Sequence, residues 1–249
     1  MIYVKKIATV VSLAVLLASG TVYAEGTNAS TAQVTQKSGK ALLRSAYDYL
    51  GSLQKYAVRT TIVNTVTEED ESIEMKRTSD VKVQRPDKFR IDSKGEYIDR
   101  SVYLSNGQFT MMDNNEKYYA TVKTGKGIDK TLEHISKRLG IILPVSTLMH
   151  SDMNKYIHPS RVQYFGTRVL AGVECNYIAF RQKKTTVHMW IENSNTPLIR
   201  AAKIITDASN DKGTSDMVMK WDTTPSFSDS DFVFKAPKGA SNVSIKPAK

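Results

Sequence analysis

Residues 100–122 read RSVYLSNGQFTMMDNNEKYYATV, and the architecture of the rest of the chain can be worked out from them. Apolar and polar residues alternate over 100–104, 109–112 and 118–122, which is the period of a β-strand with one buried face. Asn106-Gly107 lies between the first two segments, and Asn-Gly between alternating segments is a strong hairpin signal. Asp113-Asn114-Asn115 supplies the second turn. These residues therefore predict an antiparallel meander.

The same pattern continues on both sides of the meander. Further alternating, β-branched segments lie at 56–66, 73–83 and 89–92 before it, and at 164–170, 173–180, 187–192, 198–206 and 217–221 after it. Ala171-Gly172 and Asn193-Ser194-Asn195 mark turns between the later segments. About ten to eleven antiparallel strands are expected, and a sheet that wide curls or closes instead of staying flat.

Two segments have the spacing of amphipathic helices. Apolar residues recur at helical intervals over 36–53 and again over 128–142, where Pro144 precedes a short apolar segment at 145–149. The concave face of a curled sheet must be covered, and these segments can cover it. The predicted fold is α+β but mainly β: an incomplete, half-open antiparallel β-barrel covered by an N-terminal helix and a central helical insertion. The region of Gly140 and Pro144 is the predicted hinge of this cover.

The N-terminus has the pattern of a secretory signal peptide. Lys5 and Lys6 precede an apolar run at 7–17, and Val22-Tyr23-Ala24 offers a cleavage site. The run is shorter than the roughly 20 residues that a spanning helix needs, although an uncleaved anchor is the alternative. Thr21 stands where a lipoprotein would have its cysteine, so no lipid attachment is expected. We predict a cleaved signal peptide over 1–24, a flexible lead-in over 25–35, one domain over 36–240 and a basic tail over 241–249, in a soluble periplasmic protein.

The charge and cysteine content narrow the function classes. The formal net charge is +10, and loss of Lys5 and Lys6 would lower it to +8. The basic residues are spread along the chain, which favours a solvated cationic surface or attraction to anionic lipid headgroups over a nucleic-acid site. Cys175 is the single cysteine, so an intramolecular disulfide is excluded. Its alternating neighbours favour a small buried core residue over a catalytic thiol.

Catalytic and metal-binding motifs are missing from the sequence. The four histidines are His134, His150, His158 and His188. They show neither HExxH nor another metal-ligand spacing, and the chain has no GxSxG or P-loop motif. A hydrogen-bonded structural role is expected for His188. We therefore predict no catalytic residue, no metal and no cofactor, and a protein that is not an enzyme.

The second half of the chain resembles a known family. Residues 173–181 (VECNYIAFR), 189–192 (MWIE), 197–200 (PLIR) and 232–234 (FVF), followed by Pro237 and Ala240, are similar to predicted periplasmic proteins of unknown function. That family looks like a branch of the LolA/LppX-like superfamily of lipoprotein and lipid carriers. The resemblance implies an incomplete barrel closed by helices, and a hydrophobic ligand. Asn176-Tyr177 stands where the family has an Asp-His pair, and Ile199 replaces a second proline.

A periplasmic binding or carrier protein is therefore the predicted function. Its ligand would be an acyl chain, a lipid or a lipidated protein, held between sheet and helices. Met75, Met111, Met112, Met189, Met217 and Met219 all fall in predicted strands, and methionine suits a deformable apolar pocket. The alternatives are a fully packed structural or interaction module and an envelope hydrolase. We expect a monomer that contacts membrane or envelope proteins transiently and binds no nucleic acid.

Two of the predicted strands each contain an arginine among β-branched or apolar residues. Arg59 and Arg77 each lie among β-branched or apolar residues, where a buried cation needs a partner. If Arg59 points inward it would hold the carbonyl groups of the covering helices or meet a ligand's polar head; otherwise it points to solvent. The predicted lining residues are Arg59, Met75, Phe89, Ile91, Leu104, Phe109, Met111, Leu132, Ile135, Leu139, Met149 and Met189.

Overall fold

The computed structural model describes residues 38–68, 71–143, 145–182, 184–208 and 211–246. The predicted signal peptide, the lead-in and Pro144 lie outside these ranges. The strands are β1 (Lys55–Glu68), β2 (Glu71–Gln84), β3 (Lys88–Gly95), β4 (Asp99–Ser105), β5 (Gln108–Asp113), β6 (Tyr118–Lys123), β7 (Val162–Leu170), β8 (Val173–Gln182), β9 (Thr185–Glu192), β10 (Ile199–Ala208), β11 (Asp211–Asp222) and β12 (Ser241–Asn242). The helices are α1 (Gly39–Ser52), α2 (Ile128–Leu139) and α3 (Ser146–Met149), with single 3₁₀ turns at Met153–Lys155 and Asp229–Asp231.

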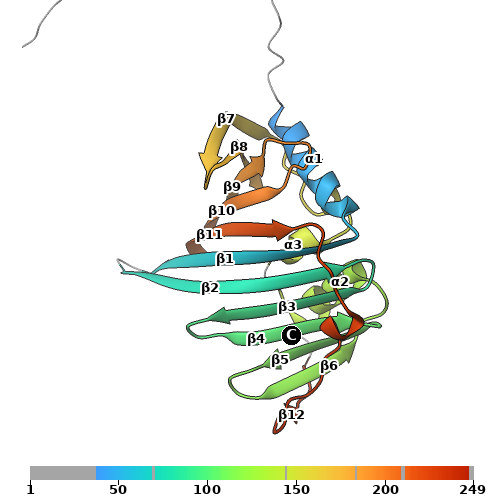
Figure 1. Ribbon diagram of the computed structural model, residues 1–249. Coiled ribbons are helices and arrows are strands. Elements are labelled where there is room, and N and C mark those ends of the chain that lie inside the picture. The colour runs from blue at the N-terminus through green and yellow to red at the C-terminus, as the bar shows by residue number, and fades with distance from the viewer. Residues whose placement is uncertain (1–37, 69–70, 144, 183, 209–210, 247–249) are drawn as a thin grey trace, which may run out of the picture. The chain divides into compact units, whose positions relative to one another are not determined.

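The described strands form one open, curved sheet in the order β12-β6-β5-β4-β3-β2-β1-β11-β10-β9-β8-β7 (Figure 1). Each hairpin pairs sequence neighbours, and β11 returns to pair with β1, for example Val58 opposite Trp221. Neighbouring strands are antiparallel except β12, which runs parallel to β6. The half-open, mainly β fold predicted from the sequence is confirmed, with the edges β7 and β12 left unpaired with each other.

Turn chemistry fixes the register of the meander. Asn106 and Gly107 both have positive φ, at 53° and 71°, as a tight two-residue hairpin turn requires. Leu104 therefore lies opposite Phe109, and Val102 lies opposite Met111. Ala171 and Gly172 adopt the same left-handed conformation between β7 and β8. These two predicted turns thus join paired strands.

The helices cover one face of the sheet, which we call the inner face. The side chain of Ser38 caps α1, and α2 ends at Gly140 in the left-handed conformation, where glycine is favoured. Leu43 and Leu50 of α1 and Ile135 of α2 belong to one buried cluster with the inner side chains of the sheet. Figure 1 shows α1 beside the β7–β10 end, and its contacts with β7, β8 and β9 agree. The start of α2 is tied to the turn between β2 and β3 by a hydrogen bond from the Ile128 amide to the Pro86 carbonyl.

The C-terminal segment crosses the opposite, outer face. Asp231 accepts a 2.5 Å hydrogen bond from Lys82, and Asp229 accepts one of 2.7 Å from Lys88. Phe232 is fully buried, and the Phe234 ring packs on Tyr103 and Tyr119. The segment then forms β12 against β6. The sheet consequently extends to residue 242, two residues past the predicted domain end at residue 240.

Candidate functional site

The inner face divides into two halves, and the first is filled with side chains. We call it the packed half: the inner face of β2–β5 together with α2. Phe89 and Phe109 meet edge to face with ring centroids 6.5 Å apart. Ile91, Leu104 and Ile135 are also buried in this cluster. Aromatic and branched side chains from both layers pack against each other here.

The second half contains an apolar pocket of about 460 Å³. We call it the hollow half: the inner face of β8–β11 under α1, α3 and the segments flanking α3. Its sheet wall consists of Phe180, Gln182, Thr185, Val187, Met189, Ile199, Ala202, Ile204, Met217 and Met219. Its cover consists of Tyr47, Ile142, Leu143, Val145, Ser146, Thr147, Leu148, Tyr156 and Ile157. The volume lies in the range of small-molecule sites, and the lining is mostly hydrophobic as in such sites.

Two lining residues, Tyr47 and Gln182, each have a buried polar atom without a partner among the described residues: the Tyr47 hydroxyl and the Gln182 Oε1. The Tyr47 side chain is 1% exposed, and its hydroxyl has no hydrogen-bond partner among the described residues. Burial raises the pKa of Tyr47, so the hydroxyl keeps its proton and remains a donor. A buried donor left unsatisfied costs about 1–3 kcal/mol. The hydroxyl is therefore a protonated donor without an acceptor, on a residue that borders the pocket.

Side chains of the sheet hold the cover of the pocket by donating hydrogen bonds to its backbone carbonyls. Arg85, at the end of β2, donates to the carbonyls of Leu53, Met149 and His150 at 3.1, 2.8 and 3.1 Å. Tyr56 of β1 donates to the Leu148 carbonyl at 3.2 Å. A charged donor on carbonyls that α1 and α3 leave free is a favourable arrangement. Arg85 thus performs the cover-holding role that we considered for Arg59.

A second attachment joins the start of α2 to the end of α3. Asp129 accepts hydrogen bonds from His150 Nδ1 at 2.9 Å, from the Ser151 amide at 2.9 Å and from the Ser151 hydroxyl at 2.5 Å. Burial opposes the charge on Asp129, but these bonds outweigh it and hold its pKa below the usual range. Burial likewise lowers the pKa of His150 despite the carboxylate beside it. At neutral pH the pair is therefore a carboxylate bonded to a neutral imidazole.

The predicted lining residues separate between the two halves. Met189 lines the pocket. Phe89, Ile91, Leu104, Phe109, Leu132, Ile135 and Met149 are buried in the core, with Met111 and Leu139 packed against it. Met75 lies on the inner face but beyond the helices, with 38% of its surface exposed.

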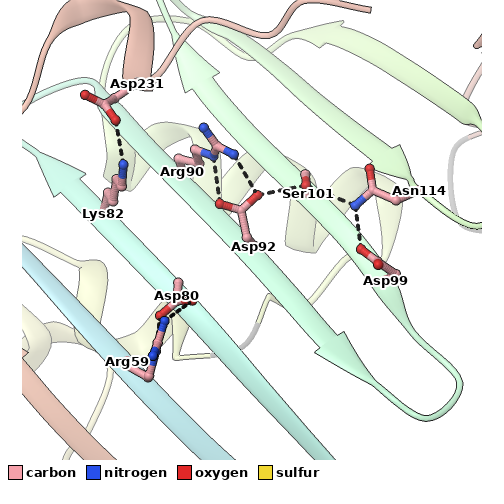
Figure 2. A network of polar contacts seen from close by, with 9 residues as sticks. All are labelled: Arg59, Asp80, Lys82, Arg90, Asp92, Asp99, Ser101, Asn114 and Asp231. Atoms are coloured by element: carbon pink, nitrogen blue, oxygen red, sulfur yellow. Dashed lines mark hydrogen bonds and ion pairs between the residues drawn. The ribbon is translucent and has the colours of Figure 1, made fainter. Parts of the chain in front are cut away.

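Arg59 lies on the outer face. Val58, Thr60 and Ile62 are buried on the inner face, so the alternation of the strand directs Arg59 the other way. It forms a bidentate pair with Asp80, at 2.6 and 2.9 Å, and its side chain is 64% exposed. Figure 2 shows this pair beside other ion pairs of the outer face, including Lys82–Asp231 and Arg90–Asp92. This placement excludes Arg59 from the pocket lining.

Arg77 is the arginine that faces inward. It lies opposite Ile62 on β1 and Gly95 on β3. Its Nε is buried without a hydrogen-bond partner, and it forms no ion pair with an acidic side chain within the described ranges. Burial lowers the pKa of its guanidinium. Among the described residues of the inner face, Arg77 is thus a cation without an acidic partner, and it lies outside the lining of the pocket.

The remaining candidate residues are structural. Cys175 is fully buried, and burial raises the pKa of its thiol, as expected for a core residue. His188 Nδ1 lies 2.7 Å from the Tyr177 hydroxyl, and Tyr177 stacks on Trp190 with ring centroids 4.9 Å apart. In the described part of the chain, no three His, Cys, Asp or Glu side chains converge as metal ligands would.

A larger recess of about 830 Å³ lies between α1 and residues 151–160, and it shares Tyr47 and Ile157 with the apolar pocket. Charged side chains line it, among them Lys40, Arg44, Asp48 and Asp152. The exposed Arg44–Asp48 pair, 3.5 Å apart, belongs to a solvated helix surface. The smaller pocket is therefore the apolar one of the two.

The sequence signals for the pocket were the period-2 alternation and the methionines. Met217 and Met219 lie in a predicted strand and form part of the wall. The sequence analysis did not predict Ala202 and Ile204 as lining residues. Alternation identifies the inner face of a strand, but it does not show which part of that face the helices pack against and which part stays open. Tyr47 was missed since its position on α1 indicates only burial.

The comparisons with known proteins concern family and fold. The model of the family described as "Predicted periplasmic protein (DUF2092)" matches residues 39–246. No curated protein matches the chain in sequence. No helix in the described ranges is long and apolar enough to cross a membrane.

Several solved structures are similar in fold at low identity. One is an uncharacterised conserved protein from Thermus thermophilus, with 9% identity, a TM-score of 0.49, and coverage of 84% of this chain and 99% of that one. The lipoprotein LppX of Mycobacterium tuberculosis has 13% identity, a TM-score of 0.42, and coverage of 76% and 97%. A LolA superfamily protein from Nitrosomonas europaea has 8% identity, a TM-score of 0.42, and coverage of 80% and 98%.

Proposed function

Because the chain belongs to the DUF2092 family of predicted periplasmic proteins, we propose that it is a periplasmic binding or carrier protein for a hydrophobic ligand. The ligand is an acyl chain, a lipid or the acyl part of a lipidated protein. The observation that carries the proposal is the apolar pocket between β8–β11 and the cover formed by α1, α3 and their flanking segments. Its walls offer apolar contacts and one unpaired hydroxyl, on Tyr47.

The energetics suit reversible binding. Burial of one methylene contributes about 0.8 kcal/mol, so a chain of about 16 carbons gains roughly 12 kcal/mol when fully buried. Association and ordering remove an estimated 4–15 kcal/mol of that gain. A binding protein of this kind needs no catalytic group, only access to the pocket. The short α3 and the left-handed Gly140 before it lie in the part of the cover that we expect to move.

The pocket favours this function over the two alternatives. A purely structural module would have both halves of the inner face filled, whereas only the packed half is. A hydrolase would need a nucleophile with its base at the pocket. The lining includes Ser146, Thr147 and Thr185 but no histidine or carboxylate. His150 lines a neighbouring recess with Ser146 and Thr147, but its Nδ1 is hydrogen-bonded to Asp129 and not to either hydroxyl.

Paired substitutions on β11 provide the test. Met217 lines the pocket, while its neighbour Val218 points to the outer face and is 48% exposed. Met217→Trp should fill the pocket and abolish uptake of a fluorescent fatty acid, and Val218→Trp should leave uptake unchanged. Equal uptake by both variants would exclude this pocket as the binding site.

Mass spectrometry of native protein addresses the physiological ligand. Protein purified from the periplasm should carry a lipid that is extracted by organic solvent, and Met217→Trp should carry much less. If neither co-purified lipid nor fatty-acid uptake were detected in the unmodified protein, the carrier function would be wrong. A packed structural role would then be the better explanation.

A further inference from the structure

Arg77 carries an unmatched positive charge on the same face as the pocket. Arg77 and Arg100, an inner-face arginine of β4, each have a buried Nε without an acceptor among the described residues. The guanidinium of Arg100 lies 3.6 Å from the Asp113 carboxylate, whereas Arg77 has no acidic partner within the described ranges. Leaving a cation partly buried and unpaired is costly. A side chain in this state is suited to an anion that arrives with a ligand.

The neighbours of Arg77 on the adjacent strands supply no competing charge. Gly95 lies opposite it on β3, and a Cβ at Gly95 would lie 3.1 Å from the Arg77 Cβ and 3.2 Å from Cγ2 of the apolar Ile98. Ile62 lies opposite on β1 and is apolar. Ser79, two residues along β2, already bonds the Ser93 hydroxyl at 2.8 Å. An anion at the guanidinium would therefore meet no carboxylate from these neighbouring positions.

The sheet register connects Arg77 to the pocket. Arg77 lies opposite Ile62, and Ile62 lies opposite Met217, a wall residue of the pocket. With strands about 4.8 Å apart, the backbone of Arg77 is roughly 10 Å from that of Met217. Ile62 is fully buried, so the side chains that cover it must move aside before a ligand with its head at the guanidinium can place its tail beside Met217 in the apolar volume.

We propose that Arg77 binds the anionic head group, a phosphate or a carboxylate, of an amphiphile whose hydrocarbon tail occupies the pocket. This inference rests on the proposed function and names its ligand class. A guanidinium binds both anions through paired hydrogen bonds. Neutral lipids of the same tail length would bind less tightly, because they leave the Arg77 nitrogens without an acceptor.

The test compares amphiphiles that share one tail. Hexadecanoate, hexadecyl phosphate and hexadecanol are titrated against protein loaded with a neutral apolar dye, and displacement gives their affinities. The unmodified protein should prefer the two anions by about tenfold or more, the usual strength of a hydrogen bond to a charged group. Arg77→Met should bind all three alike. Arg59→Met, which removes a paired arginine from the outer face, should retain the preference.

The outcomes separate the inference from the function on which it rests. If Arg77→Met kept the anion preference, or if the unmodified protein had none while still binding hexadecanol, Arg77 would not be a head-group site and the carrier function would stand. If none of the amphiphiles displaced the dye, the carrier function would fail and the inference with it. Thermal unfolding should show Arg77→Met to be as stable as the parent or more so; a large loss of stability would indicate a structural role instead.

Two further measurements identify the source of the anion. Inorganic phosphate and acetate alone should displace no dye and should compete only weakly with hexadecyl phosphate. Cosedimentation with vesicles of anionic phospholipid should be equal for the parent and Arg77→Met. Binding of free phosphate or vesicles that depended on Arg77, without preference among the amphiphiles, would overturn the proposal.

Discussion

The packed half and the hollow half of the inner face have the same strand pattern but different side chains. In the packed half, Phe89 and Phe109 project from adjacent parts of the meander and meet beneath α2. In the hollow half, the corresponding inner positions include Ala202, Met217 and Met219. Small and unbranched side chains leave volume that aromatic rings would occupy. Stability and ligand binding should consequently respond to different substitutions.

The sharpest difference between the halves should appear on removing a core ring. Phe89→Ala should lower the free energy of unfolding by about 3–5 kcal/mol, because it opens a cavity in a fully packed region. Uptake of a fluorescent fatty acid by the protein that remains folded should be unchanged. Chemical denaturation and dye titration measure the two quantities. A weakened affinity in folded Phe89→Ala would mean that the halves are not separate.

Removal of the cover attachment should have the next largest effect. Arg85→Met breaks three hydrogen bonds to backbone carbonyls, of Leu53, Met149 and His150. We expect a loss of about 2–3 kcal/mol, since bonds from a charged donor are the stronger kind. Hydrogen exchange should accelerate over 145–151 and stay slow in β3–β5. Uniform acceleration would show that Arg85 stabilises the whole sheet instead of the cover.

Arg59 and Arg77 show that strand periodicity predicts the face of the sheet to which a side chain points. Val58, Thr60 and Ile62 alternate with Arg59, so the outward direction of Arg59 was already contained in the sequence. The same alternation along β2 groups Arg77 with Val81 and directs it inward. The sheet, its turns and its helical cover were predictable for this reason, because each depends on local period and turn chemistry.

The position of the pocket was not predictable in the same way. It depends on how α3 and the segments beside it pass over β8–β11, which are contacts between residues far apart in the sequence. Arg85 illustrates this, because its three carbonyl partners lie 32 to 65 residues away. The predicted lining favoured large apolar residues, and these fill the packed half. A pocket instead needs positions at which large side chains are missing.

A smaller effect, of opposite sign, should come from the unpaired hydroxyl. Tyr47→Phe removes a buried donor that has no partner among the described residues, so the ligand-free protein should gain up to about 1 kcal/mol. The matched variant Tyr56→Phe removes a hydroxyl bonded to the Leu148 carbonyl and should lose about 1 kcal/mol. Tyr47→Phe should also bind hexadecanoate less tightly. Destabilisation by Tyr47→Phe would show that its hydroxyl has a partner within the protein.

The smallest expected effect is a pH dependence of the cover. Burial lowers the pKa of His150 in the folded protein, so the unfolded chain takes up its proton first as pH falls. The stability due to the neutral imidazole is therefore complete above the unfolded pKa of about 6.5 and declines below it.

Between about pH 7.5 and pH 5.5 the unfolding midpoint should fall by at most about 2 °C through this group. Asp129, whose pKa is also lowered, ionises below this window and adds nothing to the slope. His150→Gln should flatten the decline, and an unchanged slope would assign the pH dependence to groups outside the cover.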